Sequence, residues 1–158
     1  MSLFFRLLFK IETNYSEWKR ARLKRYLKAC GRNFSLDDGA HIWSPELMEV
    51  GDDCCLRGYS YVYAGGGIVL GDRVRIAANC VITSVSHEMV RPAPQQWRSA
   101  IYTPVEIQDD VWIGANVVVC AGVKIGAGSI IGAGSVVTKD IPAGVFAAGV
   151  PAQVLRPV

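Results

Sequence analysis

Aliphatic residues recur at every sixth position over most of this 158-residue sequence. Six is a multiple of the strand period of two and not of the helical period of 3.6, so one side chain per hexad can point to the same interior. Three hexads then close one coil around an aliphatic core, which predicts a parallel β-helix from about residue 36 to residue 148. A sandwich with evenly spaced strands is the alternative, and the many positions in register disfavour it. Grouped so that the internal step is six, the positions are Leu36 and Ile42; Val50, Leu56 and Val62; Leu70, Ile76 and Ile82; Ile107, Ile113 and Val119; and Ile125, Ile131 and Val137.

Small residues accompany the aliphatic positions at fixed offsets. Glycine often follows the aliphatic residue directly, where we expect it to permit positive-φ turns between short strands. A small or β-branched residue often stands four places after it. The glycines are Gly51, Gly71, Gly114, Gly126 and Gly132, and the residues four places on include Cys54, Ser60, Val74, Cys80, Ser86, Val111, Val117, Val123, Ser129 and Ser135.

The one large break in the repeat separates Ile82 from Ile107. Their spacing of 25 residues (107 − 82) exceeds one hexad by 19, so the surplus must leave the coil as a loop, which we place at residues 88–104. Prolines in this segment are expected to forbid regular pairing. Trp97 is a large aromatic residue outside the repeat, and loops of this length on a rigid scaffold usually carry function. The prolines are Pro92, Pro94 and Pro104.

The chain begins with a strongly basic segment. Positions 1–33 contain nine Lys and Arg residues and two Glu residues, so this segment has a charge of +7. The whole chain has a net charge of +3, so the remaining residues carry −4. A capping-box pattern at Asn14 and Glu17 and a glycine at position 31 predict a basic amphipathic helical segment over residues 1–35. Two roles stay open: capping the open end of the β-helix core, which we favour, or contact with a membrane surface. Residues 149–158 are predicted to form a C-terminal tail.

Cysteine and histidine are few. Five cysteines without a C-x-x-C pair, together with two histidines, disfavour a zinc site and a disulfide framework. Charged residues interrupt the apolar opening MSLFFRLLFK, which disfavours a signal peptide. We therefore expect no metal and a cytoplasmic location, with the inner membrane face as an option for the basic segment. No nucleic-acid-binding motif accompanies the charge, so no nucleic-acid partner is expected.

Several motifs in the second half of the chain are similar to those of one enzyme family. They are His87 just before the extruded segment, V-W-I-G at 111–114, G-A-G-S-V-V-T-K-D-I-P at 132–142 and A-G-V-P at 148–151. Together with the hexads, they resemble the left-handed β-helix acetyltransferases, and within them the galactoside and maltose O-acetyltransferases and relatives in surface-polysaccharide assembly. The left-handed winding of the predicted all-β fold is implied by this resemblance alone.

The resemblance implies acetyl-CoA as the acyl donor, a homotrimer, and sites that lie between neighbouring subunits. It also implies that His87 is the general base that takes the proton of the acceptor hydroxyl. This role suits the chemistry, because a sugar hydroxyl is a poor nucleophile and imidazole can accept its proton at neutral pH. Glu88 either orients the imidazole ring or is a solvated carboxylate. His41 is expected to be structural.

The same resemblance assigns the remaining candidate residues. Trp112 matches a tryptophan near the acceptor and the thioester, although it could also fill a subunit interface. Arg57 stands where relatives have an asparagine that contacts the acceptor. Trp97 is a further acceptor candidate because of its place in the extruded loop. Gln153 stands where relatives often have a second arginine. The candidates for CoA binding, besides Trp112, are Ala115, Ala133, Thr138, Lys139 and Arg156.

These observations predict an acetyl-CoA-dependent O-acetyltransferase that transfers the acetyl group directly to a hydroxyl of a sugar or of a polysaccharide or glycolipid precursor. An N-acetyltransferase acting on an amino sugar and a non-catalytic solenoid scaffold are the alternatives. A metal-dependent hydratase on the same solenoid would need three histidine ligands, and the chain has two histidines.

Overall fold

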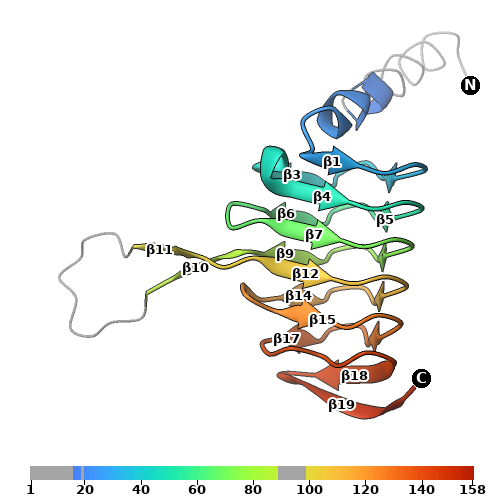
Figure 1. Ribbon diagram of the computed structural model, residues 1–158, viewed down its shortest axis with the longest axis vertical. Coiled ribbons are helices and arrows are strands. Elements are labelled where there is room, and N and C mark those ends of the chain that lie inside the picture. Colours follow the sequence, from blue (N-terminus) through green and yellow to red (C-terminus); the bar gives the residue numbers. More distant parts are fainter. Residues whose placement is uncertain (1–15, 19, 89–98) are drawn as a thin grey trace, which may run out of the picture.

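The computed structural model describes residues 16–18, 20–88 and 99–158, and it shows a parallel β-solenoid of three sheets preceded by a short helix (Figure 1). Successive strands pass from one sheet to the next, so the three sheets form three faces of one column. Face 1 consists of β1 (Ala29–Cys30), β4 (Met48–Val50), β7 (Ile68–Leu70), β12 (Val105–Ile107) and β15 (Lys124–Ile125). Face 2 consists of β2 (Ser35–Leu36), β5 (Cys55–Leu56), β8 (Arg75–Ile76), β13 (Trp112–Ile113), β16 (Ile130–Ile131), β18 (Val145–Gly149) and β19 (Ala152–Pro157). Face 3 consists of β3 (His41–Trp43), β6 (Tyr61–Tyr63), β9 (Val81–Thr83), β14 (Val118–Val119) and β17 (Val136–Val137).

The aliphatic repeat predicted from the sequence is confirmed as the register of the coil. On face 2, Leu36 pairs with Leu56, Leu56 with Ile76, Ile76 with Ile113 and Ile113 with Ile131. A turn of 18 residues (131 − 113) is three hexads, and a turn of 20 (56 − 36) carries two additional corner residues. Equivalent positions therefore stack one above another on every face.

The stacked aliphatic side chains form the core. All fourteen predicted positions except Ile42 are buried, and Ile42 packs against the core from its partly buried position. Most of the small residues four places on are buried too, because they stand two residues before the next aliphatic position and point to the same side of the chain. Ser86 is the exception and is exposed, since the chain has already left the coil at that point.

The glycines of the repeat serve a different structural role from the predicted one. The left-handed backbone positions lie two residues later, at Asp53, Arg73 and Asn116 for example, and not at Gly51, Gly71 or Gly114. A Cβ at Gly51 would lie 2.5 Å from the Gly71 carbonyl oxygen on the next turn. These glycines thus permit close approach of neighbouring turns, and the expected positive-φ role at these positions was wrong.

The interruption of the repeat lies where it was predicted, but part of it is paired. Strands β10 (Val85–His87) and β11 (Ala100–Tyr102) form an antiparallel hairpin that projects from the column (Figure 1). The expectation that the loop at 88–104 lacks regular pairing is therefore wrong for its return arm. Pro104 follows β11, while Pro92, Pro94 and Trp97 lie outside the described residues.

Gly65 and Gly66 make room for the root of this hairpin. The Gly66 N–H donates to Ser84 Oγ at 2.8 Å, and a Cβ at Gly66 would lie 2.4 Å from the Ser84 carbonyl oxygen. A Cβ at Gly65 would lie 3.2 Å from the ring of Tyr102 on β11. The two glycines therefore fix the direction in which the hairpin leaves the coil.

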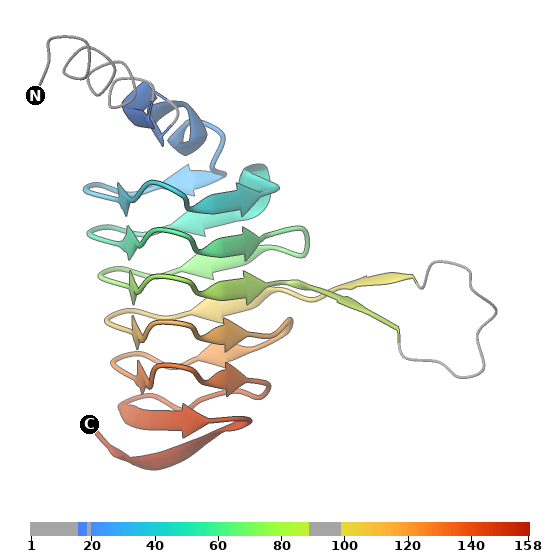
Figure 2. The same ribbon diagram turned by 180° about the vertical axis from the view of Figure 1, so that it is seen from behind.

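Both ends of the column differ from the predicted boundaries. The helix covers residues 16–18 and 20–24, η1 (Pro45–Leu47) is a 3-10 turn, and β1 already pairs with β4 at Ala29–Cys30, inside the segment 1–35 assigned to the helix. Leu23 packs against the core and Leu27 belongs to it. The helix lies at the N-terminal end of the solenoid (Figure 2). The C-terminal tail at 149–158 contains β19, which pairs antiparallel with β18. Within the part of the chain described, no helix has the length and apolar composition needed to span a bilayer.

Candidate active site

The proposed base lies on the projecting hairpin. His87 ends β10, opposite Ala100 on β11, and the Glu88 N–H donates to the Ser99 carbonyl oxygen at 3.2 Å. Both side chains are exposed. Among the side chains described, neither the His87 ring nor the Glu88 carboxylate has a hydrogen bond or ion pair, so an interaction that orients the ring stays a prediction.

The hairpin leaves the column at the edge between faces 3 and 1. The chain runs from β9 on face 3 through β10 and β11 to β12 on face 1. Thr138 and Lys139 follow β17 at the same edge, directly after Val137, which is in register through Val119 with Ile82 on β9. Both residues are exposed. This edge therefore carries the predicted base and two of the candidate CoA residues.

Trp112 lies on the opposite side of the column. It occupies the outward position of β13 on face 2 and is 54% exposed. Ala115 and Ala133 follow on the edge between faces 2 and 3, where the Gly134 N–H donates to the Ala115 carbonyl oxygen at 2.8 Å. In a column of three faces, face 2 stands opposite the edge between faces 3 and 1. His87 and Trp112 of one chain consequently point away from each other.

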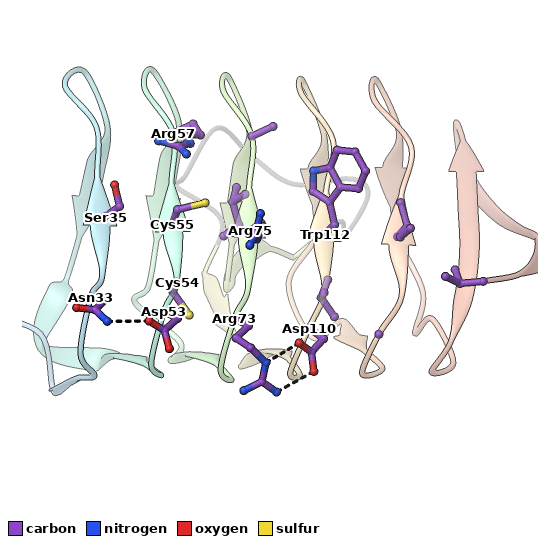
Figure 3. A pocket seen from close by; sticks show the side chains of 16 residues that line it. Asn33, Ser35, Asp53, Cys54, Cys55, Arg57, Arg73, Arg75, Asp110 and Trp112 are labelled. Carbon is purple, nitrogen blue, oxygen red and sulfur yellow. Dashed lines mark hydrogen bonds and ion pairs between the residues drawn. The ribbon is translucent and has the colours of Figure 1, made fainter.

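A groove of about 960 Å³ runs along face 2 (Figure 3). It includes Arg57 and Trp112 but not His87. Its floor is a column of outward residues from successive turns, in which Cys55 pairs in register with Arg75 and Arg75 with Trp112. The groove residues that carry polar or aromatic groups are Asn33, Ser35, Asp53, Cys54, Cys55, Arg57, Arg73, Arg75, Asp110 and Trp112.

One margin of the groove holds its own ion pair. Arg73 Nε and Nη2 donate to Asp110 Oδ1 and Oδ2 at 2.6 and 2.8 Å, and the Asn33 amide donates to Asp53 Oδ1 at 2.8 Å. The hydrogen bond from Arg73 lowers the pKa of Asp110. Such a bidentate pair fixes both side chains in place.

Arg156 lies at the C-terminal end of face 2. Its guanidinium lies 5.2 Å from the centre of the Phe146 ring, and Nη1 donates to the Pro157 carbonyl oxygen at 3.0 Å. The strand β19 that carries it pairs with β18, so the predicted phosphate-binding residue belongs to the last layer of the column. The predicted site residues thus fall into separate groups on one chain.

The cysteines differ in their burial. Cys54 and Cys80 are buried as predicted, and burial raises the pKa of both thiols. Cys55 is half-buried in the groove. Within residues 16–18, 20–88 and 99–158, no group of three or more His, Cys, Asp or Glu side chains is placed to hold a metal ion.

Sequence reasoning missed Arg75 and the position of Cys55 in the groove. The signal was present, because each stands directly before a buried aliphatic position, as Trp112 does before Ile113. Residues in that phase of the hexad point outward from the same face and stack on successive turns. The chemical character of face 2 could therefore be read from this phase of the repeat.

Comparisons with known proteins agree with this architecture. The bacterial transferase hexapeptide family (six repeats) matches residues 104–139, and the hexapeptide repeat of succinyl-transferase matches residues 49–84. Galactoside O-acetyltransferase of Escherichia coli K12 is 43% identical over 91 residues, covering 58% of this chain and 44% of that protein. A Saccharomyces cerevisiae protein named as an acetyltransferase is 36% identical over 137 residues, covering 86% of this chain and 69% of that protein.

Solved structures are similar over most of the chain. A hexapeptide-repeat acetyltransferase from Vibrio cholerae O1, in complex with acetyl-CoA, superposes with a TM-score of 0.84 at 31% identity, covering 89% of this chain and 76% of that one. A galactoside acetyltransferase in complex with coenzyme A gives a TM-score of 0.72 at 30% identity, covering 89% and 70%. The chain belongs to the hexapeptide-repeat acetyltransferase family. It spans less than half the length of the E. coli relative.

Proposed function

We propose that this protein is an acetyl-CoA-dependent O-acetyltransferase whose acceptor is a hydroxyl of a sugar or of a glycolipid or polysaccharide precursor. The observation that carries the proposal is the similarity over most of the chain to acetyltransferases solved with acetyl-CoA or coenzyme A. The resemblance to galactoside O-acetyltransferases favours a hydroxyl over an amine as the acceptor.

The residues of this chain fit such a donor. Ala115 and Ala133 present small side chains on neighbouring turns, where a pantetheine arm can approach the backbone closely. Thr138, Lys139 and Arg156 are exposed, and the two cations suit the phosphates of CoA. The exposed Trp112 ring offers an apolar surface on face 2.

In the proposed reaction, the His87 imidazole accepts the proton of the acceptor hydroxyl as its oxygen attacks the thioester carbonyl. The new C–O bond forms, the C–S bond breaks, and CoA leaves as the thiol after taking up the proton from His87. A general base of this kind typically contributes ~10² to 10⁴ in rate. No acyl-enzyme forms, and the buried thiols of Cys54 and Cys80 are poorly suited to act as nucleophiles.

The proposed site is shared between subunits of a homotrimer. His87 and Trp112 lie on opposite sides of one column, so they can line the same site only across a contact between two copies. Thr138 and Lys139, at the hairpin edge, and Ala115 and Ala133, at another edge, would likewise reach one CoA from two chains. A cytoplasmic location fits a CoA-dependent reaction, and the basic N-terminal segment suits a lipid-linked acceptor at the membrane face.

The test measures free CoA released from acetyl-CoA across a panel of sugars, for the wild type, His87→Ala and His41→Ala. His41, the other histidine, stacks on Tyr61 at 5.0 Å on face 3 and serves as the matched control. We expect His87→Ala to lose at least ~10²-fold in kcat and His41→Ala to retain activity. Normal turnover by His87→Ala would exclude it as the base.

An N-acetyltransferase is the second candidate. A tetrahydropyridine-dicarboxylate N-acetyltransferase of Staphylococcus saprophyticus is 57% identical over 54 residues, although these cover only 23% of that protein. Comparing hydroxyl and amino sugars in the same assay separates the two reactions. A scaffold without catalysis would fail to bind acetyl-CoA by calorimetry.

A further inference from the structure

The floor of the face-2 groove has a cationic half and an apolar half. Arg75 lies between Cys55 and Trp112 in one column of outward residues, and Arg57 lies two positions along the chain from Cys55 (Figure 3). On the next turn, Ile130 pairs in register with Trp112 and extends the apolar half of the floor. A ligand in this groove would thus meet guanidinium groups at one end and an indole ring at the other.

The carboxylates of the groove do not neutralise these two arginines. Asp110 is engaged by Arg73 at the margin, and Asp53 accepts a hydrogen bond from Asn33 there. Arg75 has no ion pair or hydrogen bond with any side chain described. The groove centre therefore carries a positive charge without a protein partner.

Arg57 is only weakly engaged. Its Nη1 lies 3.3 Å from Asp37 Oδ1, a long contact between side chains that are 52% and 38% exposed. Exposed pairs of this kind contribute little, and a guanidinium has five N–H donors, so most of its hydrogen-bonding capacity is available.

We propose that the acceptor is an anionic sugar, bearing a phosphate or a carboxylate, and that Arg57 and Arg75 bind the anion while the sugar ring packs against Trp112. This inference rests on the proposed acetyl transfer and names its substrate class. The planar guanidinium matches phosphate and carboxylate oxygens in a bidentate manner, and an exposed indole ring suits the apolar face of a sugar.

The diphosphate of CoA is the competing anion for these arginines. The candidate CoA residues near face 2 lie toward its C-terminal end: Ala115 and Ala133 follow β13 and β16, and Arg156 lies on β19. Arg57 and Arg75 lie on earlier turns than Trp112, toward the N-terminal end of face 2. This placement favours the acceptor.

The kinetic test compares methyl galactoside, galactose 1-phosphate and galacturonate as acceptors, with CoA release as the readout. We expect the wild type to prefer an anionic acceptor, and the phosphate and the carboxylate arms identify which anion. Arg57→Gln and Arg75→Gln should each lower kcat/KM for that acceptor by about 10- to 100-fold, the range for a lost hydrogen bond to a charged group. Lys124→Gln, which removes a cation from the exposed pair with Glu106 on face 1, should have no effect.

Two kinetic results would overturn the proposal. One is a wild-type preference for the neutral methyl galactoside. The other is a loss in the arginine variants that falls on the KM for acetyl-CoA, which would assign the arginines to the donor.

A second measurement needs no turnover. Cys55 is half-buried next to Arg75, so a bound anionic sugar should slow its reaction with iodoacetamide, followed by peptide mass spectrometry at constant ionic strength. The exposed Cys30 is the internal control. We expect protection of Cys55 by galactose 1-phosphate or galacturonate, none by galactose, and loss of protection in Arg75→Gln.

Equal protection by galactose, or protection that persists in Arg75→Gln, would contradict anion binding at this position. If no acceptor leads to CoA release but an anionic sugar still protects Cys55, the proposed acetyl transfer is refuted and the proposed anion-binding site is supported. If acetyl transfer is found only with neutral sugars, the proposed function stands and the anionic acceptor is refuted.

Discussion

The hairpin that carries His87 is attached to the coil through the buried hydroxyl of Ser84. A variant without this hydroxyl tests two effects separately: the stability of the fold and the position of His87. Ser84 is fully buried, and its Oγ accepts from the Gly66 N–H and donates to the Tyr63 carbonyl oxygen, both at 2.8 Å. In Ser84→Ala the Tyr63 oxygen keeps the Ser84 N–H, while the Gly66 N–H loses its partner.

Leaving one buried donor unsatisfied costs about 1–3 kcal/mol. For a chain of this size, that corresponds to a fall in Tm of about 2–10 °C, measured by circular dichroism at fixed protein concentration. Since Ser84 lies three residues before His87, we also expect kcat to fall by up to ~10²-fold, as for other displaced catalytic groups.

Ser60→Ala is the matched control. Ser60 Oγ is equally buried, donates to the Ala77 carbonyl oxygen at 3.2 Å and accepts from the Cys80 N–H at 3.1 Å, away from the hairpin. It should lower Tm and leave kcat unchanged. An unchanged Tm in Ser84→Ala would refute the hydrogen-bond argument, and an equal loss of kcat in both variants would refute the positioning argument.

Three further predictions concern the column itself. Ile113→Ala, at a fully buried position in the stack, should destabilise the protein by about 2–5 kcal/mol in urea unfolding, and a cost below about 1 kcal/mol would contradict the packing described. The hydrogen bond from Arg73 lowers the pKa of Asp110, so this pair stabilises the fold above the ordinary carboxyl pKa and the contribution is lost as pH falls through the lowered one. Asp110→Asn should therefore lower Tm near pH 7, and its effect should shrink as the pH falls below the ordinary carboxyl pKa; an effect that is independent of pH would argue against this pair. Iodoacetamide should leave Cys54 and Cys80 unmodified in the folded protein because burial raises the pKa of both thiols, and mass spectrometry that finds either one labelled as fast as an exposed thiol would contradict their burial.

The hexad spacing was sufficient to predict the core, because a period of six fixes both the direction of a side chain and its neighbour on the next turn. Leu56, Ile76 and Ile113 stack as their spacing requires, and the extruded segment begins after Ile82 as its surplus of residues requires. These features depend only on counting along the chain.

The features that were missed depend on contacts between turns. The reason for glycine at position 51 is the carbonyl of Gly71 one turn later, which no local backbone preference indicates. Pairing of Val85–His87 with Ala100–Tyr102 needs an antiparallel register that the hexads do not encode. Likewise, the relation of Arg75 to Trp112 follows from the inter-turn register rather than from a motif.

Mixing two variants that we each expect to be inactive tests most directly whether the site is built by two subunits from opposite sides of their columns. His87→Ala and Trp112→Ala are purified, unfolded together and refolded at equal amounts, and CoA release is compared with that of each variant refolded alone. If His87 and Trp112 of different chains share one site, random assembly restores about a quarter of the sites, and activity rises toward that fraction of the wild type. No recovery in mixed oligomers of confirmed composition would contradict the account.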